Sequence, residues 1–298
     1  MNSPNSISSQ GLSIPEYINL RNSNLNKYSG KNITVAIVDS GIATHNDLKS
    51  NRIIETVDFV NNYNDLVYDD YGHGTFVSGI IGANGTLIGI APEVNFISIK
   101  VLDEFGETDE KKLSLALDWI YENKEKYNIQ LVYLSAGKFL SQDKDKKTIE
   151  LYIEKLFKKE VIIVCPSGNT GPNKESVLFP ATINNVITVG TVNTNYTYNL
   201  EDDISASFSS WSQNHSKPEL FTVGIDILSL SNSSKDSYSL NSGTSFSAAI
   251  ITGVIALILE SDPDSSIDTI RKQLLANRIN IIPSLPWSGE LYLKKKHD

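Results

Sequence analysis

Short apolar runs rich in valine and isoleucine recur along the chain and form its clearest pattern. These runs do not alternate regularly with polar residues, which is typical of parallel strands that are buried on both faces of a sheet. Five of them lie at positions 33–38, 94–102, 129–134, 161–165 and 186–192. We therefore predict that these runs form the strands of a parallel sheet.

Between these runs and after the last of them, apolar residues return at the spacing of one face of a helix. The pattern i, i+3 or i+4, i+7 occurs at 113–120 and 149–157 and is repeated at 267–275, where Ser265 or Ser266 is placed to act as the N-cap. Strands that alternate with helices indicate βαβ units. The predicted fold class is therefore α/β.

The length and composition of the chain fit one such domain. The chain has 298 residues, of which 40% are hydrophobic, so it can bury a substantial core. No internal repeat and no low-complexity linker divides it. We predict an N-terminal arm at 1–30 that packs on the surface of a single domain at 31–298.

Charge and targeting signals exclude several function classes. The net charge is −9 and no basic stripe is present, so we expect no nucleic-acid partner. No apolar run appears long enough to cross a bilayer, and residues 1–10 lack the features of a signal peptide. The single cysteine, Cys165, excludes an intrachain disulfide and fits a reducing compartment. We therefore expect a cytoplasmic protein without a membrane partner.

Three glycine-flanked segments place an aspartate, a histidine and a serine in that chain order. Asp39 ends the first apolar run, His73 lies in Gly-His-Gly-Thr before a predicted helix, and Ser245 follows Gly-Thr before another. Each has a structural alternative, namely a turn aspartate, a surface histidine and a helix N-cap serine. Together they fit a catalytic triad, in which a buried aspartate orients the imidazole that deprotonates the serine.

An oxyanion donor is the fourth group that such chemistry needs. Asn169 lies in Ser-Gly-Asn-Thr-Gly directly after the run that ends at Cys165. Its side-chain amide can donate to a tetrahedral oxyanion together with the backbone N–H of Ser245. The structural alternative is an asparagine that only forms a turn. We predict that Asp39, His73, Ser245 and Asn169 form one catalytic site.

The chain resembles the subtilisin family of serine proteases over nearly its whole length, and the order Asp, His, Ser is the order in that family. Further matching segments have no catalytic role; they are His45-Asn46-Asp47-Leu48, Gly89-Ile90-Ala91-Pro92, Phe179-Pro180-Ala181 and Lys217-Pro218-Glu219-Leu220. The resemblance implies a mostly parallel, seven-stranded sheet with helices on both faces. It also implies that Ser135, Ala136 and Gly137 pair with a peptide or protein substrate as an edge strand.

Several positions depart from the family pattern. Phe76 and Phe246 replace a common histidine and a common methionine, and Lys138 replaces a common glycine. The loop at 84–87 is shorter than the loop that holds calcium in many secreted members, and it offers few oxygen ligands. We therefore expect no cofactor and no metal at that loop, while weaker calcium sites elsewhere stay possible.

Substrate preference is the least defined part of the sequence analysis. The resemblance places Leu178 near the bottom of the pocket for the residue before the scissile bond, and Thr170 beside it adds no charge, so a small or medium uncharged residue is expected there. We favour removal of the leader peptide from a lanthipeptide precursor, with an intracellular protease of broad specificity as the alternative. A catalytically silent binding module and an esterase with the same triad are the alternatives from other classes. The oligomeric state stays open.

Overall fold

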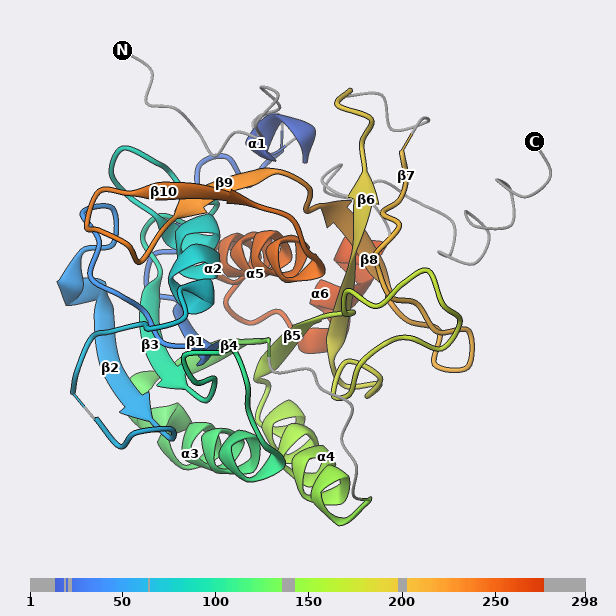
Figure 1. Cartoon of the computed structure of the whole chain (residues 1–298), viewed down its shortest axis with the longest axis horizontal. Helices are drawn as coiled ribbons and strands as arrows, with labels where there is room; N and C mark the ends of the chain where they lie inside the picture. The colour runs from blue at the N-terminus through green and yellow to red at the C-terminus, as the bar shows by residue number, and fades with distance from the viewer. Residues whose placement is uncertain are drawn as a thin grey trace.

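A computed structural model describes residues 14–18, 20, 23–63, 65–135, 143–197 and 203–275. At its centre is an eight-stranded sheet, in which seven strands run parallel and the two-residue β7 runs antiparallel to β6. The order is β2-β3-β1-β4-β5-β6, and both β7 and β8 pair with β6 (Figure 1). The strands are β1 (Thr34–Asp39), β2 (Ile53–Asp58), β3 (Asn95–Lys100), β4 (Ile129–Leu134), β5 (Ile162–Pro166), β6 (Ile187–Asn193), β7 (Ile204–Ser205) and β8 (Leu220–Val223).

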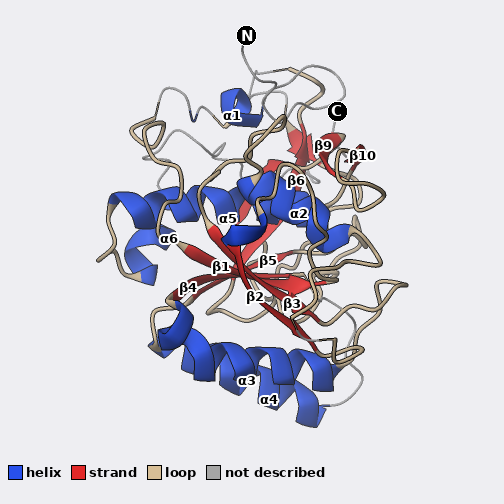
Figure 2. Cartoon of the chain, turned by 90° about the vertical axis from the view of Figure 1, so that its left-hand side faces the viewer, coloured by secondary structure: helices blue, strands red, loops and turns tan. Residues whose placement is uncertain are grey.

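Helices cover both faces of the sheet (Figure 2). The helices α3 and α4 lie on one face, and α2, α5 and α6 lie on the other. Their bounds are α1 (Ile14–Tyr17), α2 (His73–Gly82), α3 (Glu110–Tyr127), α4 (Asp143–Lys158), α5 (Thr244–Ser261) and α6 (Ile267–Leu275), and a 3-10 turn spans Ser50–Arg52. Successive residues of β1 pack into opposite cores, because Val35 and Ile37 face α2 and α5 whereas Ala36 and Val38 face α3 and α4.

The predicted α/β fold with a mostly parallel sheet is confirmed. Each of the five predicted strands is present, and so is each predicted helix, with Ser266 accepting a hydrogen bond from the N–H of Thr269 at the start of α6. The sheet has eight strands instead of the seven expected, because β7 adds two residues at the β6 edge. The pattern did not predict β2, which is half-exposed and interrupted by polar side chains, or β8, which has only four residues.

A small antiparallel hairpin lies outside the main sheet and across α2 (Figure 1). It consists of β9 (Ile227–Leu230) and β10 (Tyr238–Asn241). The hydroxyl of Ser229 in β9 donates to the carbonyl of Phe76 in α2 at 2.6 Å, which fixes the hairpin against that helix. The hairpin therefore forms a wall above the start of α2 and of α5.

One helix corrects the expectation that no apolar run could cross a bilayer. In the described residues, α5 has 18 residues with a mean hydropathy of 1.7, which meets the length and composition of a membrane span. However, 89% of this stretch is buried inside the protein. It is hydrophobic all round because it runs through the core between the sheet and α2, as a fully buried helix does.

The described part of the predicted N-terminal arm is tied closely to the domain. Ile14 and Ile18 are buried within the same core as α5. The carboxylate of Glu260, near the end of α5, accepts the backbone N–H groups of Ser29, Gly30 and Lys31 at 2.6–3.1 Å. Three donors on one carboxylate oxygen anchor the segment that leads into β1.

Candidate active site

Asp39 lies at the carboxyl end of β1, in the middle of the sheet, where functional groups gather in open α/β folds. It is completely buried. One carboxylate oxygen accepts the backbone N–H of Ser40 at 2.7 Å. The two oxygens lie 2.9 and 2.8 Å from Nδ1 of His73. Because an ionised carboxylate only accepts hydrogen bonds, Nδ1 of His73 carries the hydrogen and Nε2 keeps its lone pair.

His73 is the first residue of α2, and two neighbours fix its position. Gly72 precedes the helix with φ at 96°, a left-handed conformation that favours glycine. A Cβ at Gly74 would collide with the carbonyl oxygen of Gly41, so the segment after β1 and the helix can meet only through glycine. The N–H of Gly74 then donates to the hydroxyl of Ser40 at 2.9 Å. These contacts explain why the histidine lies between glycines.

Asp69 caps the same helix and was not identified from the sequence. Its carboxylate accepts N–H groups from Gly72 and Thr75, at 2.7 and 2.9 Å, and the hydroxyl of Thr75 at 2.6 Å. Asp69 lies three residues before Gly72, the N-cap of α2, so the usual signal of a capping residue directly before a helix does not single it out from Asp70. Asp69 also adds negative charge near the imidazole of His73.

The pKa of His73 is raised above the ordinary value of about 6.5. Burial of the ring lowers the pKa, but the charge and the hydrogen bond of Asp39, together with the charge of Asp69, raise it by more. The imidazole is therefore a stronger base than a free histidine. Its side chain is 21% exposed, so a substrate can still reach Nε2.

This shift predicts the acidic limb of the activity profile. A protonated Nε2 cannot accept a proton, so kcat/KM should fall as the pH falls through the raised pKa of His73. A pH series of kcat/KM should give a midpoint above 6.5. Asp69→Asn removes one of the charges that raise the pKa and should move the midpoint towards lower pH. A midpoint at or below 6.5 in the unmodified protein would contradict this account.

Ser245 is the second residue of α5, where the helix dipole favours developing negative charge. Its side chain is nearly buried, and its hydroxyl oxygen lies 3.3 Å from the hydroxyl oxygen of Ser135. The buried Tyr133 donates its hydroxyl to the carbonyl of Ser245 at 3.2 Å and holds the backbone at this turn. Burial is the largest cause of the raised pKa of Tyr133, and the charge of Asp39 adds to it, so the phenol stays protonated as a donor. The apolar pattern of β4 gave no signal for this role.

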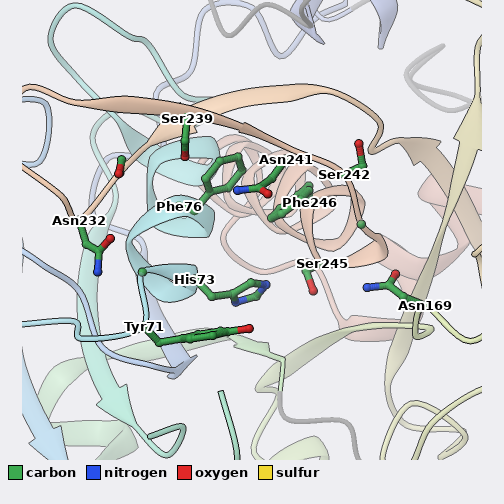
Figure 3. Close-up of a pocket in the computed structure, with 13 residues that line it drawn as sticks. Tyr71, His73, Phe76, Asn169, Asn232, Ser239, Asn241, Ser242, Ser245 and Phe246 are labelled. Carbon is green, nitrogen blue, oxygen red and sulfur yellow. The ribbon is translucent and has the colours of Figure 1, made fainter. Parts of the chain in front are cut away.

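Asn169 is oriented by the residue that precedes the serine. Its Oδ1 accepts the N–H of Thr244 at 3.0 Å and the hydroxyl of Thr244 at 2.9 Å. With the oxygen held in this way, the Nδ2 group points towards the side of Ser245 (Figure 3). The amide is therefore turned so that its donor faces the place where an oxyanion would form.

His73, Ser245 and Asn169 line one cavity of about 380 Å³, in which the imidazole points towards the serine (Figure 3). Asp39 lies behind the imidazole, bonded to its far nitrogen. The structure thus brings together four side chains that are up to 206 positions apart in the sequence, from 39 to 245. The cavity is open, and a base, a hydroxyl and an amide donor meet at its floor.

Three of the five predicted substrate-binding residues are described, and they lie at or beside this site. Ser135 follows β4 and reaches the hydroxyl of Ser245. Leu178 packs against Gly168, directly before Asn169, so it lies beside the oxyanion donor. Thr170 turns its hydroxyl towards the carbonyl of Ser176 at 3.1 Å instead of towards the cavity. Ala136 and Gly137, like Lys138, lie outside the described residues.

The two aromatic departures from the family pattern are in contact with each other. The rings of Phe76 and Phe246 have centroids 4.5 Å apart, and the ring of Phe246 lies 6.0 Å from that of His73. Both phenylalanines are almost fully buried. The sequence showed the two substitutions separately, whereas the fold shows that they form one aromatic pair on the hairpin side of the histidine (Figure 3).

The short loop at 84–87 is held by a carboxylate. Asp47 accepts the N–H groups of Thr86 and Leu87, each at 2.8 Å, and the hydroxyl of Tyr238 at 2.9 Å. Both carboxylate oxygens thus have protein donors. Among the described residues, no group of three or more histidine, cysteine, aspartate or glutamate side chains is placed to hold a metal ion.

This fold and this arrangement of aspartate, histidine and serine define a serine hydrolase with a subtilisin-like architecture. The subtilase family model, Peptidase S8, matches residues 30–284, and the chain belongs to this family. The enzyme class of the family is that of serine endopeptidases, which hydrolyse peptide bonds.

Individual relatives agree with this assignment. Serine protease AprX of Bacillus subtilis is 32% identical over 84% of this chain, which spans 61% of the length of that protein. The major intracellular serine protease of the same organism is 30% identical, with 89% of this chain and 82% of that protein covered. The structure of S41 psychrophilic protease superposes with a TM-score of 0.78 at 25% identity, covering 93% of this chain and 91% of that one.

Proposed function

We propose that this chain is an active endopeptidase in which Ser245 is the nucleophile, His73 the general base and Asn169 an oxyanion donor. The observation that supports this most directly is the bond between the buried Asp39 and Nδ1 of His73. It leaves Nε2 as the acceptor in the same cavity as the serine hydroxyl. A binding module would have no need for this tautomer.

The reaction follows from these positions. His73 takes the proton from the hydroxyl of Ser245 as its oxygen attacks the peptide carbonyl, and the oxyanion accepts Nδ2–H of Asn169 and the N–H of Ser245. His73 then gives its proton to the leaving amine, which departs and leaves an ester on Ser245. Water enters, loses a proton to His73 and releases the acid, after which the serine regains its proton.

A paired substrate assay with a covalent probe tests this proposal. An organophosphonate should label Ser245 and no other residue, because the hydroxyl of Ser245 shares the cavity with His73, whose Nε2 is the acceptor. A peptide panel should be hydrolysed alongside p-nitrophenyl acetate. Hydrolysis of the ester without any peptide would instead favour an esterase, and absence of both would favour the silent binding module.

For the natural role, we propose an intracellular protease that cuts several protein substrates. The support is the name and the coverage of the major intracellular relative, together with a single buried cysteine that needs no oxidising compartment. The names of the relatives give no support to removal of a lanthipeptide leader. Leu178 beside the oxyanion donor supports a shallow pocket for an uncharged residue before the scissile bond.

Product mapping separates the two roles. Casein should be cut at many sites, and mass spectrometry of the products should show mostly small or medium uncharged residues on the acyl side of each cut. Fractionation of the source cells should find the protein in the cytoplasm. A single efficient cut in a leader-containing precursor with little digestion of casein would favour the leader-peptidase hypothesis. Fast cleavage after arginine or tryptophan would contradict the shallow pocket.

We also propose that folding and activity are independent of calcium at the loop 84–87. The donors from Thr86, Leu87 and Tyr238 compensate the charge of Asp47 in the way that a cation would. Melting temperature and kcat/KM should therefore stay unchanged when EDTA is added, whereas Tyr238→Phe should lower the melting temperature in either condition. A large loss on chelation that calcium restores would show that a metal site exists.

A further inference from the structure

Lys100 is a charged residue inside the protein that the proposed reaction does not use. It is the last residue of β3, and only 2% of its surface is exposed. Taking an ammonium group out of water costs free energy unless the group is paired and fully hydrogen-bonded. The partners that compensate this cost therefore show which parts of the fold the lysine holds together.

The ammonium group of Lys100 has three acceptors on three different segments. Its Nζ donates to the carbonyl of Ser40 at 2.9 Å, to the carbonyl of Leu102 at 2.7 Å and to a carboxylate oxygen of Asp70 at 2.5 Å. The ring of Tyr68 lies with its centroid 5.3 Å from Nζ, close enough for a cation–π contact. Because an ammonium group has three donors, each donor has an acceptor and the side chain is fixed in one position.

The first acceptor belongs to the residue that follows Asp39. Asp39 and Lys100 are directly paired in the register of β1 and β3, so the lysine lies beside the strand end that carries the carboxylate. The N–H of Ser40 donates to that carboxylate at 2.7 Å, while the carbonyl of Ser40 accepts from Lys100. The hydroxyl of Ser40 accepts the N–H of Gly74 in α2. Lys100 thus holds the residue that contacts both Asp39 and the helix that begins with His73.

The acidic partner belongs to the segment that leads into α2. Asp70 lies three residues before His73 and directly after Asp69, whose carboxylate accepts N–H groups at the start of the helix. The ion pair between Lys100 and Asp70 therefore links the end of β3 to the approach of α2. The side chain of Asp70 is 29% exposed, so neutralising its charge does not by itself require a buried lysine.

We propose that Lys100 is a positioning residue for the catalytic pair of Asp39 and His73. Because it holds the carbonyl of Ser40 and the segment before α2 at once, it sets the separation of the two elements that carry the carboxylate and the imidazole. The contact of 2.8 Å between Asp39 and Nδ1 of His73 depends on that separation, and the tautomer of the base depends on the contact. The inference rests on the proposed endopeptidase function, since it concerns the same base.

Replacing the ion pair by neutral side chains of similar size tests this role. Asp70→Asn keeps an oxygen that can accept from Lys100, so it should retain kcat within about fivefold. The double variant Lys100→Met/Asp70→Asn leaves no unpaired charge but releases the carbonyl of Ser40. It should lose about 10–100-fold in kcat relative to Asp70→Asn with little change in KM, because a small displacement of a catalytic group has an effect of that size.

A proton NMR spectrum adds a readout that loss of stability would not change. The hydrogen on Nδ1 of His73 is shared with a carboxylate and should resonate far downfield, and its absence from His73→Ala assigns it. In the double variant this resonance should shift or disappear at temperatures well below the melting transition. Its position reports the contact between Asp39 and His73 directly, whether or not a substrate is present.

Lys217→Met is the matched control, because Lys217 is a second buried lysine and is 4% exposed. Its Nζ donates to the carbonyl of Val186 at 2.7 Å and pairs with Glu219 at 3.0 Å, beside the amino ends of β6 and β8 and away from Asp39. This variant should lower the melting temperature as well, since it also leaves a buried carbonyl without its donor. It should leave kcat and the downfield resonance unchanged.

The results separate this inference from the function on which it rests. If the double variant keeps the kcat and the resonance of Asp70→Asn, Lys100 only stabilises the fold and the inference is wrong. The inference is also wrong if Lys217→Met loses as much kcat as the double variant. If the unmodified protein cleaves no peptide and its Ser245 is not labelled by the phosphonate, the endopeptidase proposal itself fails.

Discussion

Ser245→Ala should lower kcat at least about 10⁴-fold, because the substitution removes the oxygen that attacks the carbonyl. The fold should survive, since the hydroxyl of Ser245 contributes little to it: its contact with the hydroxyl of Ser135 is long, at 3.3 Å. The helix α5 begins at Thr244 and receives no side-chain cap from the nucleophile. Steady-state kinetics and a melting curve of the same sample measure both effects.

A matched substitution at the other end of α5 serves as the control. The hydroxyl of Ser261 bonds to the carbonyl of Ile258 in the same helix, far from the cavity, so Ser261→Ala should retain activity and probe labelling. If Ser245→Ala kept more than about a tenth of kcat, Ser245 could not be the nucleophile, because losses of a triad member are far larger.

Asn169→Ala should lower kcat roughly 10²–10³-fold with little change in KM, because the amide donates mainly to the charge that develops in the transition state. The loss should exceed that of an ordinary polar surface contact, since the donor is held in place before the substrate arrives. Thr244 fixes Oδ1 through two hydrogen bonds and so directs Nδ2. Initial-rate kinetics over a range of substrate concentrations separate kcat from KM.

Asn169→Asp separates the role of Nδ2 as an oxyanion donor from the role of Oδ1, which holds the side chain against Thr244. Aspartate keeps an oxygen that can accept from the N–H and the hydroxyl of Thr244, but it has no Nδ2 donor. It should therefore fold normally and lose at least as much kcat as the alanine variant, because its charge opposes the oxyanion. A raised KM with unchanged kcat in both variants would mean that Asn169 only positions the substrate.

Near His73, two departures from the family pattern are expected to affect stability together, because the two side chains are in contact. Phe76 and Phe246 come from different helices and lie 170 positions apart in the sequence, from 76 to 246. Their ring centroids are 4.5 Å apart, so replacing one phenylalanine changes the side chain against which the other ring packs. We therefore expect Phe76→His and Phe246→Met to be non-additive in stability, as contacting residues are.

The fold was largely predictable because its strands are buried on both faces. In β1 every residue is buried, so selection for apolar side chains leaves a continuous run that a sequence alone reveals. The strand β2 has a half-exposed face with Glu55, and β10 is largely exposed, so neither carries such a run. Edge strands and hairpins depend on the surfaces on which they lie, and the sequence does not record those surfaces.

For the site, the sequence by itself determined the reacting residue types and their flanking glycines. Gly74 must be small because the carbonyl of Gly41 lies against it, and such backbone constraints act locally enough to leave motifs. Only the tertiary structure decided how these side chains are oriented and which hydrogen bonds and charges surround them. Tyr133 beneath Ser245, Thr244 on Asn169 and the hairpin wall are contacts between distant segments. Hydrogen bonds and electrostatic fields depend on separation in space, and the fold alone sets that separation.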